Sequence, residues 1–206
     1  MRGDGIEVDV SRETLDQLRV YHDMLLRWTA SINLIAPSTK TSAWDKHIVD
    51  SAQVFRMLPT DSRHLVDLGS GGGLPGLVLS IMSQRAMPSL ETTLVESDQR
   101  KVAFLRSVIR ELDLSAEVIC QRIEAVTGLA GDVVTARALA SLDQLLTFIA
   151  PIISPDGVAL LLKGRQAPAE IEAARRLWTF DLISHVSRTD PDARILQIKD
   201  IRHAIA

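Results

Sequence analysis

Apolar residues recur three or four positions apart near the amino end of the chain, and this spacing predicts helices. Residues 12–29 show it, and Ser11 is placed to cap the first turn. After a Pro-Ser-Thr-Lys-Thr turn, Ser42 and Asp45 resemble a capping box that starts a second helix, which a proline ends. We therefore expect a helical cap over residues 1–60.

From residue 64 onward, short apolar runs alternate with helical patterns, which predicts a parallel sheet with helices on both faces. The runs predict strands at 64–68, 90–96, 116–121, 131–138 and 157–164, with helices at 75–84, 98–112, 141–150 and 168–178. Two last strands, 180–187 and 193–199, have no helix between them and are expected to pair antiparallel. We therefore expect an α/β domain over 61–206, built on a seven-stranded, mostly parallel sheet. It would form one structural unit with the helical cap.

Composition is that of an ordinary globular protein, with 46% hydrophobic and 24% charged residues. Cys120 is the only cysteine, which excludes a disulfide framework and a cysteine-based zinc site, and its apolar neighbours predict a buried side chain. Four of the five histidines lack any metal-ligand spacing, and we assign no metal.

No apolar stretch reaches the roughly 18 residues of a membrane span. The opening MRGDGIEVDV lacks the apolar region of a secretory signal, so we expect a cytoplasmic protein.

The stretch LVDLGSGGGLPG, residues 65–76, holds five of the 11 glycines in the chain. Glycine adopts φ above zero without strain and lets a ligand approach backbone N–H groups. The stretch follows an expected strand, and Pro75 suits the first position of the next helix. Ligands of doubly wound sheets bind at such strand ends. We therefore expect a small ligand against this turn; a glycine-rich turn without a ligand is the alternative.

Two acids narrow the choice of ligand. The glycines formally match G-x-G-x-x-G, which alone is weak evidence for a dinucleotide. Asp67, two positions before Gly69, would repel a pyrophosphate but suits a cationic group. Glu96 ends the second expected strand, where an acid can accept hydrogen bonds from ribose hydroxyls. A nucleoside with a positive charge and no phosphate fits both acids, and we expect S-adenosylmethionine as cofactor. A nicotinamide-dependent oxidoreductase is the alternative.

Several motifs in order carry a resemblance to a known family. The motifs are NLIAPS and DKHIVDS, followed by LVDLGSGGGLPG, VESDQRKVAFLR, RIE, TARALASL and LLKG. With them, the chain resembles the RsmG (GidB) family of bacterial ribosomal RNA methyltransferases over roughly residues 25–165. The resemblance implies a class I, Rossmann-like methyltransferase that transfers a methyl group from S-adenosylmethionine to N7 of a guanine in 16S rRNA. Where family members often show T-G-P-G, this chain has Ser70-Gly71-Gly72-Gly73, which loosens the turn but keeps its backbone contacts.

Site residues follow from the resemblance and from the chemistry of the residues. The resemblance implies cofactor contacts at Gly69, Leu74, Ile123, Glu124 and Arg137, and we add Asp67, Gly71 and Glu96. Arg137 ends the fourth expected strand, where its guanidinium could meet the methionine carboxylate or an RNA phosphate. Lys163 ends the fifth expected strand, and we expect it to contact RNA. No catalytic residue is assigned, because N7 of guanine has a free lone pair and needs no general base.

Other polar residues have two interpretations each. Arg106 and Arg110 face outward from the helix expected at 98–112, either as a phosphate-facing strip or as a solvated face. His47 and Asp50 lie one helical turn apart and could face each other or the site, and a packing or capping histidine is an equal alternative. The three tryptophans have a spacing that favours the core over base stacking.

Two further functions remain open on sequence grounds. A methyltransferase-like fold that only binds RNA is one, although the intact glycine loop and Glu96 argue against it. Methylation of a small molecule is the other, because the net charge of −3 and the pI of about 5.9 are unusual for a nucleic-acid-binding protein. With 16S rRNA in the small ribosomal subunit as the expected partner, we expect the protein to act as a monomer.

Overall fold

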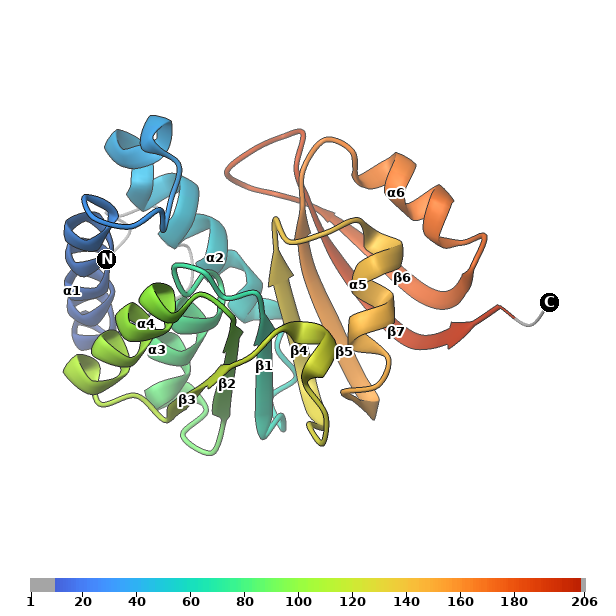
Figure 1. Cartoon of the computed structure of the whole chain (residues 1–206), viewed down its shortest axis with the longest axis horizontal. Helices are drawn as coiled ribbons and strands as arrows, with labels where there is room; N and C mark the ends of the chain where they lie inside the picture. The colour runs from blue at the N-terminus through green and yellow to red at the C-terminus, as the bar shows by residue number, and fades with distance from the viewer. Residues whose placement is uncertain (1–9, 205–206) are drawn as a thin grey trace.

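The computed structural model describes residues 10–204. The opening stretch MRGDGIEVDV, from which we expected no secretory signal, lies almost entirely outside the described residues. A seven-stranded sheet crosses the molecule in the order β3-β2-β1-β4-β5-β7-β6 (Figure 1). Strands β1 to β5 pair in parallel, whereas β7 runs antiparallel to both β5 and β6. The expected seven-stranded, mostly parallel sheet is confirmed, and β7 is its antiparallel strand.

The elements follow the predicted alternation along the chain. The strands are β1 (His64–Leu68), β2 (Glu91–Glu96), β3 (Ala116–Cys120), β4 (Gly131–Arg137), β5 (Ile153–Lys163), β6 (Trp178–Val186) and β7 (Arg194–His203). The α-helices are α1 (Arg12–Thr29), α2 (Asp50–Ala52), α3 (Gly76–Ala86), α4 (Gln99–Leu112), α5 (Leu142–Ile149) and α6 (Ala167–Ala174). Short turns of other helix types are η1 (Pro37–Ser42), η2 (Trp44–Val49), η3 (Gln53–Met57) and η4 (Ile123–Ala125).

The amino-terminal helices agree with prediction in part. Helix α1 is capped as expected, since the Ser11 hydroxyl accepts a hydrogen bond from the backbone N–H of Thr14 at 3.2 Å. The prediction of a capping box at Ser42 is wrong. The helical run already begins at Pro37, so Ala43 has helical backbone angles and no capping position exists there. Residues 37–57 instead form a chain of short 3₁₀, π and α turns.

Helices cover both faces of the sheet. Side chains alternate along each strand. Leu65 of β1 packs into a cluster with the cap and α3, whereas its neighbour Val66 packs into a cluster with α5. Figure 1 shows α1 to α4 gathered around one half of the sheet and α5 and α6 around the other. The sheet is therefore the middle layer, as expected for a doubly wound domain.

The helical cap and the sheet domain share one hydrophobic cluster. Leu18, Tyr21 and Leu25 of α1 are fully buried and belong to the same cluster as Leu77 of α3 and Phe104 of α4. Apolar side chains of this size stabilise a fold by roughly 1.5–3 kcal/mol each when they leave water. The cap is therefore held against the sheet domain by a continuous apolar contact.

Two details at the ends of elements depart from prediction. Cys120 is exposed rather than buried, because β3 is an edge strand and Cys120 stands at its carboxyl end. Helix α6 ends at Ala174, so Trp178 begins β6 instead of closing a helix. Trp178 is nevertheless buried, and Trp28 and Trp44 pack against the core, which confirms the core prediction for all three tryptophans.

Candidate functional site

The glycine loop lies at the carboxyl end of β1, between β1 and α3. Gly69 has a φ of +64°, and a Cβ atom placed on it would lie 2.6 Å from Cδ1 of Leu139. A Cβ atom on Gly76 would lie 2.7 Å from Oδ2 of Asp67. Both contacts are closer than real Cβ atoms allow. A side chain at Gly76 would displace Asp67, and one at Gly69 would displace the Leu139 side chain and strain the left-handed backbone. The loop is therefore pressed against both the strand beneath it and the segment after β4.

Glu96 locks the glycine loop from the end of β2. Its Oε2 accepts a hydrogen bond from the backbone N–H of Gly71 at 2.9 Å, and its Oε1 accepts from Ser97 and Asp98 at 2.7 and 2.8 Å. A carboxylate has about four lone-pair sites, so roughly one stays available to a ligand. The Glu96 side chain lines a cavity at this edge of the sheet.

This glycine-side cavity has a volume of about 470 Å³. It brings together five of the residues predicted to bind the cofactor, namely Gly69, Glu96, Ile123, Glu124 and Arg137. Ile123 and Glu124 come from η4, directly after β3. Small-molecule sites in proteins usually measure about 300–1,000 Å³. The cavity is thus large enough for a nucleoside-sized ligand.

Three residues predicted to bind the cofactor line neither this cavity nor the one described below. Asp67 is fully buried and accepts a hydrogen bond at Oδ1 from the Thr135 hydroxyl at 2.7 Å. Burial raises the pKa of Asp67 to about 6, although the Thr135 hydroxyl acts against this rise. Leu74 packs against the core, and Gly71 is engaged through its N–H with Glu96.

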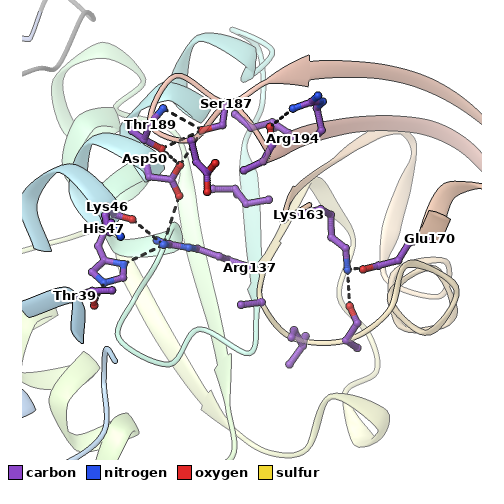
Figure 2. A pocket seen from close by; sticks show the side chains of 18 residues that line it. Thr39, Lys46, His47, Asp50, Arg137, Lys163, Glu170, Ser187, Thr189 and Arg194 are labelled. Atoms are coloured by element: carbon purple, nitrogen blue, oxygen red, sulfur yellow. Dashed lines mark hydrogen bonds and ion pairs between the residues drawn. The ribbon is translucent and has the colours of Figure 1, made fainter. Parts of the chain in front are cut away.

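A second cavity of about 530 Å³ lies between the cap and the carboxyl ends of β4 and β5. Figure 2 shows polar side chains from three parts of the chain that line this cap-side cavity. Thr39, Lys46, His47 and Asp50 come from the cap; Arg137 and Lys163 end β4 and β5; Ser187, Thr189 and Arg194 come from the β6–β7 hairpin. The cavity is therefore assembled only by tertiary structure.

Arg137 lines both cavities. Its Nη2 donates to the backbone carbonyl of Lys46 at 2.8 Å and to Nδ1 of His47 at 3.0 Å, and it lies 3.5 Å from Oδ2 of Asp50. Its Nη1 is buried and has no hydrogen-bond partner among residues 10–204. A buried guanidinium nitrogen without a partner is unfavourable, so a ligand acceptor would stabilise it.

Arg137 fixes the protonation of His47. Since Nδ1 accepts from Arg137, the ring proton resides on Nε2, which donates to the Thr39 hydroxyl at 2.8 Å. Burial lowers the pKa of His47 to about 4, and the charges of Arg137 and Lys46 contribute to this shift. His47 is therefore neutral at physiological pH and acts as an acceptor for Arg137.

Lys163 also lines the cap-side cavity, but its charge is held within the protein. Its ammonium donates to the carbonyl of Ala140 at 2.6 Å and lies 2.5 Å from Oε2 of Glu170 in α6. Lys163 is buried, so the expected contact with RNA would require a partner that enters the cavity. In the described structure the Lys163 ammonium links α6 to the segment after β4.

The segment Arg137–Ala140 forms the boundary between the two cavities, because all four residues line both. Ala138 has a φ of +49°, a left-handed conformation that is uncommon for alanine and is often found at functional sites. Sequence reasoning assigned a role only to Arg137 in this segment. The motif TARALASL, already noted as part of the family resemblance, was the signal for the other three.

The remaining surface features bear on partners. Arg106 and Arg110 are exposed on α4, which confirms their outward orientation, and Lys101 of the same helix lines the glycine-side cavity. Within the part of the chain that the structure describes, no group of His, Cys, Asp and Glu is arranged to hold a metal ion. No helix in the described part has the length and apolar character needed to cross a membrane.

Two solved structures with the same fold are methyltransferases by name. The mitomycin 7-O-methyltransferase MmcR superposes with a TM-score of 0.60 at 14% identity, covering 90% of this chain and 67% of that one. A TehB-like SAM-dependent methyltransferase from Corynebacterium glutamicum gives 0.59 at 13% identity, covering 88% and 98%. At such low identity these likenesses concern the fold alone, and they confirm the class I, Rossmann-like prediction.

Sequence comparison resolves the family. A curated relative from Paracoccus denitrificans, named ribosomal RNA small subunit methyltransferase G, is 49% identical over 198 residues, covering 96% of this chain and all of the relative. A relative of the same name from Paramagnetospirillum magneticum is 46% identical over 192 residues, covering 93% and 91%. The family model described as rRNA small subunit methyltransferase G matches residues 14–195. With these matches, the chain belongs to the GidB family of rRNA small subunit methyltransferases G.

Proposed function

We propose that this protein transfers a methyl group from S-adenosylmethionine to N7 of a guanine in the 16S rRNA of the small ribosomal subunit. Family membership supports the reaction and the substrate class. The structural observation that carries the proposal is the pair of cavities that share the segment Arg137–Ala140. Direct transfer needs donor and acceptor in adjoining sites, and these cavities adjoin.

The glycine-side cavity fits the cofactor. In this proposal Gly69 allows close approach to the backbone, Glu96 accepts a hydrogen bond from the ribose, and Ile123 and Glu124 contact the adenine. The unpartnered Nη1 of Arg137 suits the methionine carboxylate. When bound, S-adenosylmethionine supplies an electrophilic methyl group on a sulfonium. Asp67, buried under the loop, supports the site from below rather than by direct contact.

The cap-side cavity is proposed to receive the acceptor guanine. N7 is nucleophilic without deprotonation, so the site needs to place and orient the base rather than remove a proton. The polar groups that line this cavity suit a site that orients a base. His47 is neutral, Asp50 faces Arg137, and Lys163 is paired with Glu170. Alignment of reacting atoms in adjoining sites can by itself lower a barrier by roughly 7–11 kcal/mol.

RNA outside the reacting base is proposed to lie along the exposed Arg106 and Arg110 of α4. Lys101, near the start of the same helix, lines the glycine-side cavity. We propose that the protein acts as a monomer. Because the proposed substrate is ribosomal RNA, we propose the cytoplasm as the site of action.

The test is methyl transfer from labelled S-adenosylmethionine to small subunits that lack this modification, followed by strand scission specific for N7-methylguanine. Label at a single guanine is the expected result. A protein that binds the cofactor but labels no guanine in subunits or in naked 16S rRNA would overturn the proposed acceptor. Labelling of small molecules alone would move the protein to a different substrate class.

A further inference from the structure

The cap reaches the boundary between the two cavities through Arg137. The guanidinium extends from the end of β4, and Figure 2 shows it directed at His47 and Asp50. The cap supplies three acceptors to Nη2: the Lys46 carbonyl at 2.8 Å, His47 Nδ1 at 3.0 Å and Asp50 Oδ2 at 3.5 Å. These polar contacts of Arg137 run to residues 46–50, which the fold alone brings near it.

We propose that His47 and Asp50 are positioning residues that hold the Arg137 guanidinium at the boundary of the two cavities, so that the helical cap takes part in methyl transfer. The proposal rests on the proposed function, because it assigns the task of Arg137 to that reaction. His47 and Asp50 touch neither cofactor nor base in this scheme; they act through Arg137.

Guanidinium geometry explains why these contacts matter. The group is planar, and its nitrogens point in fixed directions. Once acceptors from the cap fix Nη2, the plane of the group and the direction of Nη1 are fixed as well. Nη1 is the buried nitrogen without a partner among the described residues. It is therefore prearranged to meet an anionic group of a ligand.

Asp50 divides its two oxygens between two tasks. Oδ1 accepts from the Ser187 hydroxyl at 3.2 Å, from the Thr189 hydroxyl at 2.5 Å and from Gln53 Nε2 at 2.8 Å. Oδ2 faces Arg137. In Asp50→Asn, the amide oxygen is required at the Oδ1 position to serve these donors, so the NH₂ group replaces Oδ2. That variant keeps the link to the hairpin and removes only the acceptor for Arg137.

His47 offers a matched pair of variants. Asparagine places its polar atoms near Nδ1, so His47→Asn keeps an acceptor for Arg137 and gives up the hydrogen bond to Thr39. Glutamine places its polar atoms near Nε2, so His47→Gln keeps the hydrogen bond to Thr39 and removes the acceptor. If His47 only stabilised the cap, His47→Gln would not impair Arg137 more than His47→Asn does.

The first measurement is made on the free protein by ¹⁵N NMR of the arginine side chains. A guanidinium held by acceptors rotates slowly and gives resolved NH₂ signals. We expect resolved signals for Arg137 in the wild type and in His47→Asn, and averaged signals in His47→Gln and Asp50→Asn. Asp16→Asn, which breaks the exposed pair with Arg19 in α1, is the control with the same chemical change and should leave Arg137 unaltered.

The second measurement is the rate of methyl transfer to small subunits. We expect His47→Gln and Asp50→Asn to lower it at least tenfold and His47→Asn less than threefold. In an Arg137→Ala background, Asp50→Asn should have no further effect beyond twofold, because residues that act through one another are not additive. Independent effects that multiply would overturn the proposal, and so would Arg137 signals unchanged in both disruptive variants.

The two proposals fail differently. If the wild type labels no RNA, the proposed acceptor is wrong, and the positioning role is judged by the NMR signals and by affinity for S-adenosylhomocysteine. Averaged Arg137 signals with at least tenfold weaker binding in Asp50→Asn would then uphold it, and unchanged binding would reject it.

Discussion

At the level of single residues, the site combines backbone positions that favour glycine with an ionisable group that is kept out of water. A Cβ atom at Gly69 would displace the Leu139 side chain, and Asp67 is ionisable yet fully buried. Both lie within the glycine-rich stretch that its composition singled out. Each of these two residues leads to a testable consequence of its own.

Gly69→Val should weaken binding of S-adenosylhomocysteine at least tenfold while the protein still folds. A valine at φ +64° is strained by roughly 1–2 kcal/mol, and its Cβ displaces Leu139 at the boundary of the cavity. Gly128→Val is the matched control, because Gly128 has a φ of +76° but nothing within 4 Å of an added Cβ atom. Calorimetric titration should find binding intact in the control; equally weakened binding in both variants would refute the role of Gly69.

Asp67 should impose a pH dependence on stability. Its pKa in the folded protein, about 6, is raised above the ordinary 3.8, so the folded state holds a proton that the unfolded state releases between these values. The free energy of unfolding therefore falls as pH rises from about 4 to 6, by an amount on the order of 2–3 kcal/mol, and stays low above that. Denaturant titrations across this range should show the fall in the wild type and its absence in Asp67→Asn. Parallel curves would contradict the assignment.

At the level of elements, the cap supports both cavities. Helix α1 supports the glycine loop, since the buried Tyr21 hydroxyl donates to the carbonyl of Gly72 at 2.5 Å. The segment 46–50 holds Arg137, and α6 holds Lys163 through Glu170. Elements that look peripheral in Figure 1 thus fix the loops at the carboxyl edge of the sheet.

Tyr21→Phe should destabilise the protein by about 1–2 kcal/mol, because the buried carbonyl of Gly72 loses its donor. Binding of S-adenosylhomocysteine should weaken several-fold, because the glycine loop loses its support. Thr29→Val also removes a buried hydroxyl from α1, but that hydroxyl bonds to Leu25 within the helix. The control should therefore change stability alone, as measured by denaturation and calorimetry on the same samples.

At the level of the whole molecule, the cap and the sheet share one hydrophobic cluster, and both cavities lie at the carboxyl edge of the sheet. We propose that residues 61–206 do not fold without the cap, because Leu77 and Phe104 would lose the side chains of α1 that bury them. The truncated chain should lack a cooperative thermal transition and bind no cofactor. A sharp transition in the fragment would show that the cap is a separate domain.

The exposed arginines of α4 should set the salt dependence of subunit binding. The double variant Arg106→Glu, Arg110→Glu should weaken binding and lower the salt slope by about 0.7 for each phosphate that the protein no longer neutralises. Affinity for S-adenosylhomocysteine should not change. Lys199→Glu with Arg202→Glu makes the same charge change at exposed sites on β7. If that control weakens subunit binding equally, the effect comes from overall charge and not from the position of Arg106 and Arg110.

Local sequence was sufficient for the order of strands and helices, for the glycine loop and for the family. These features follow from hydrophobic period, turn chemistry and motifs of adjacent residues. Which residues meet was settled only by packing in three dimensions. Packing placed Asp67 against Thr135 and away from the cavity, exposed Cys120 at an edge strand, and brought Asp50 to Arg137. Such pairings join segments about 70 to 140 positions apart, and no local pattern encodes them, because the free energy that selects them comes from the whole core.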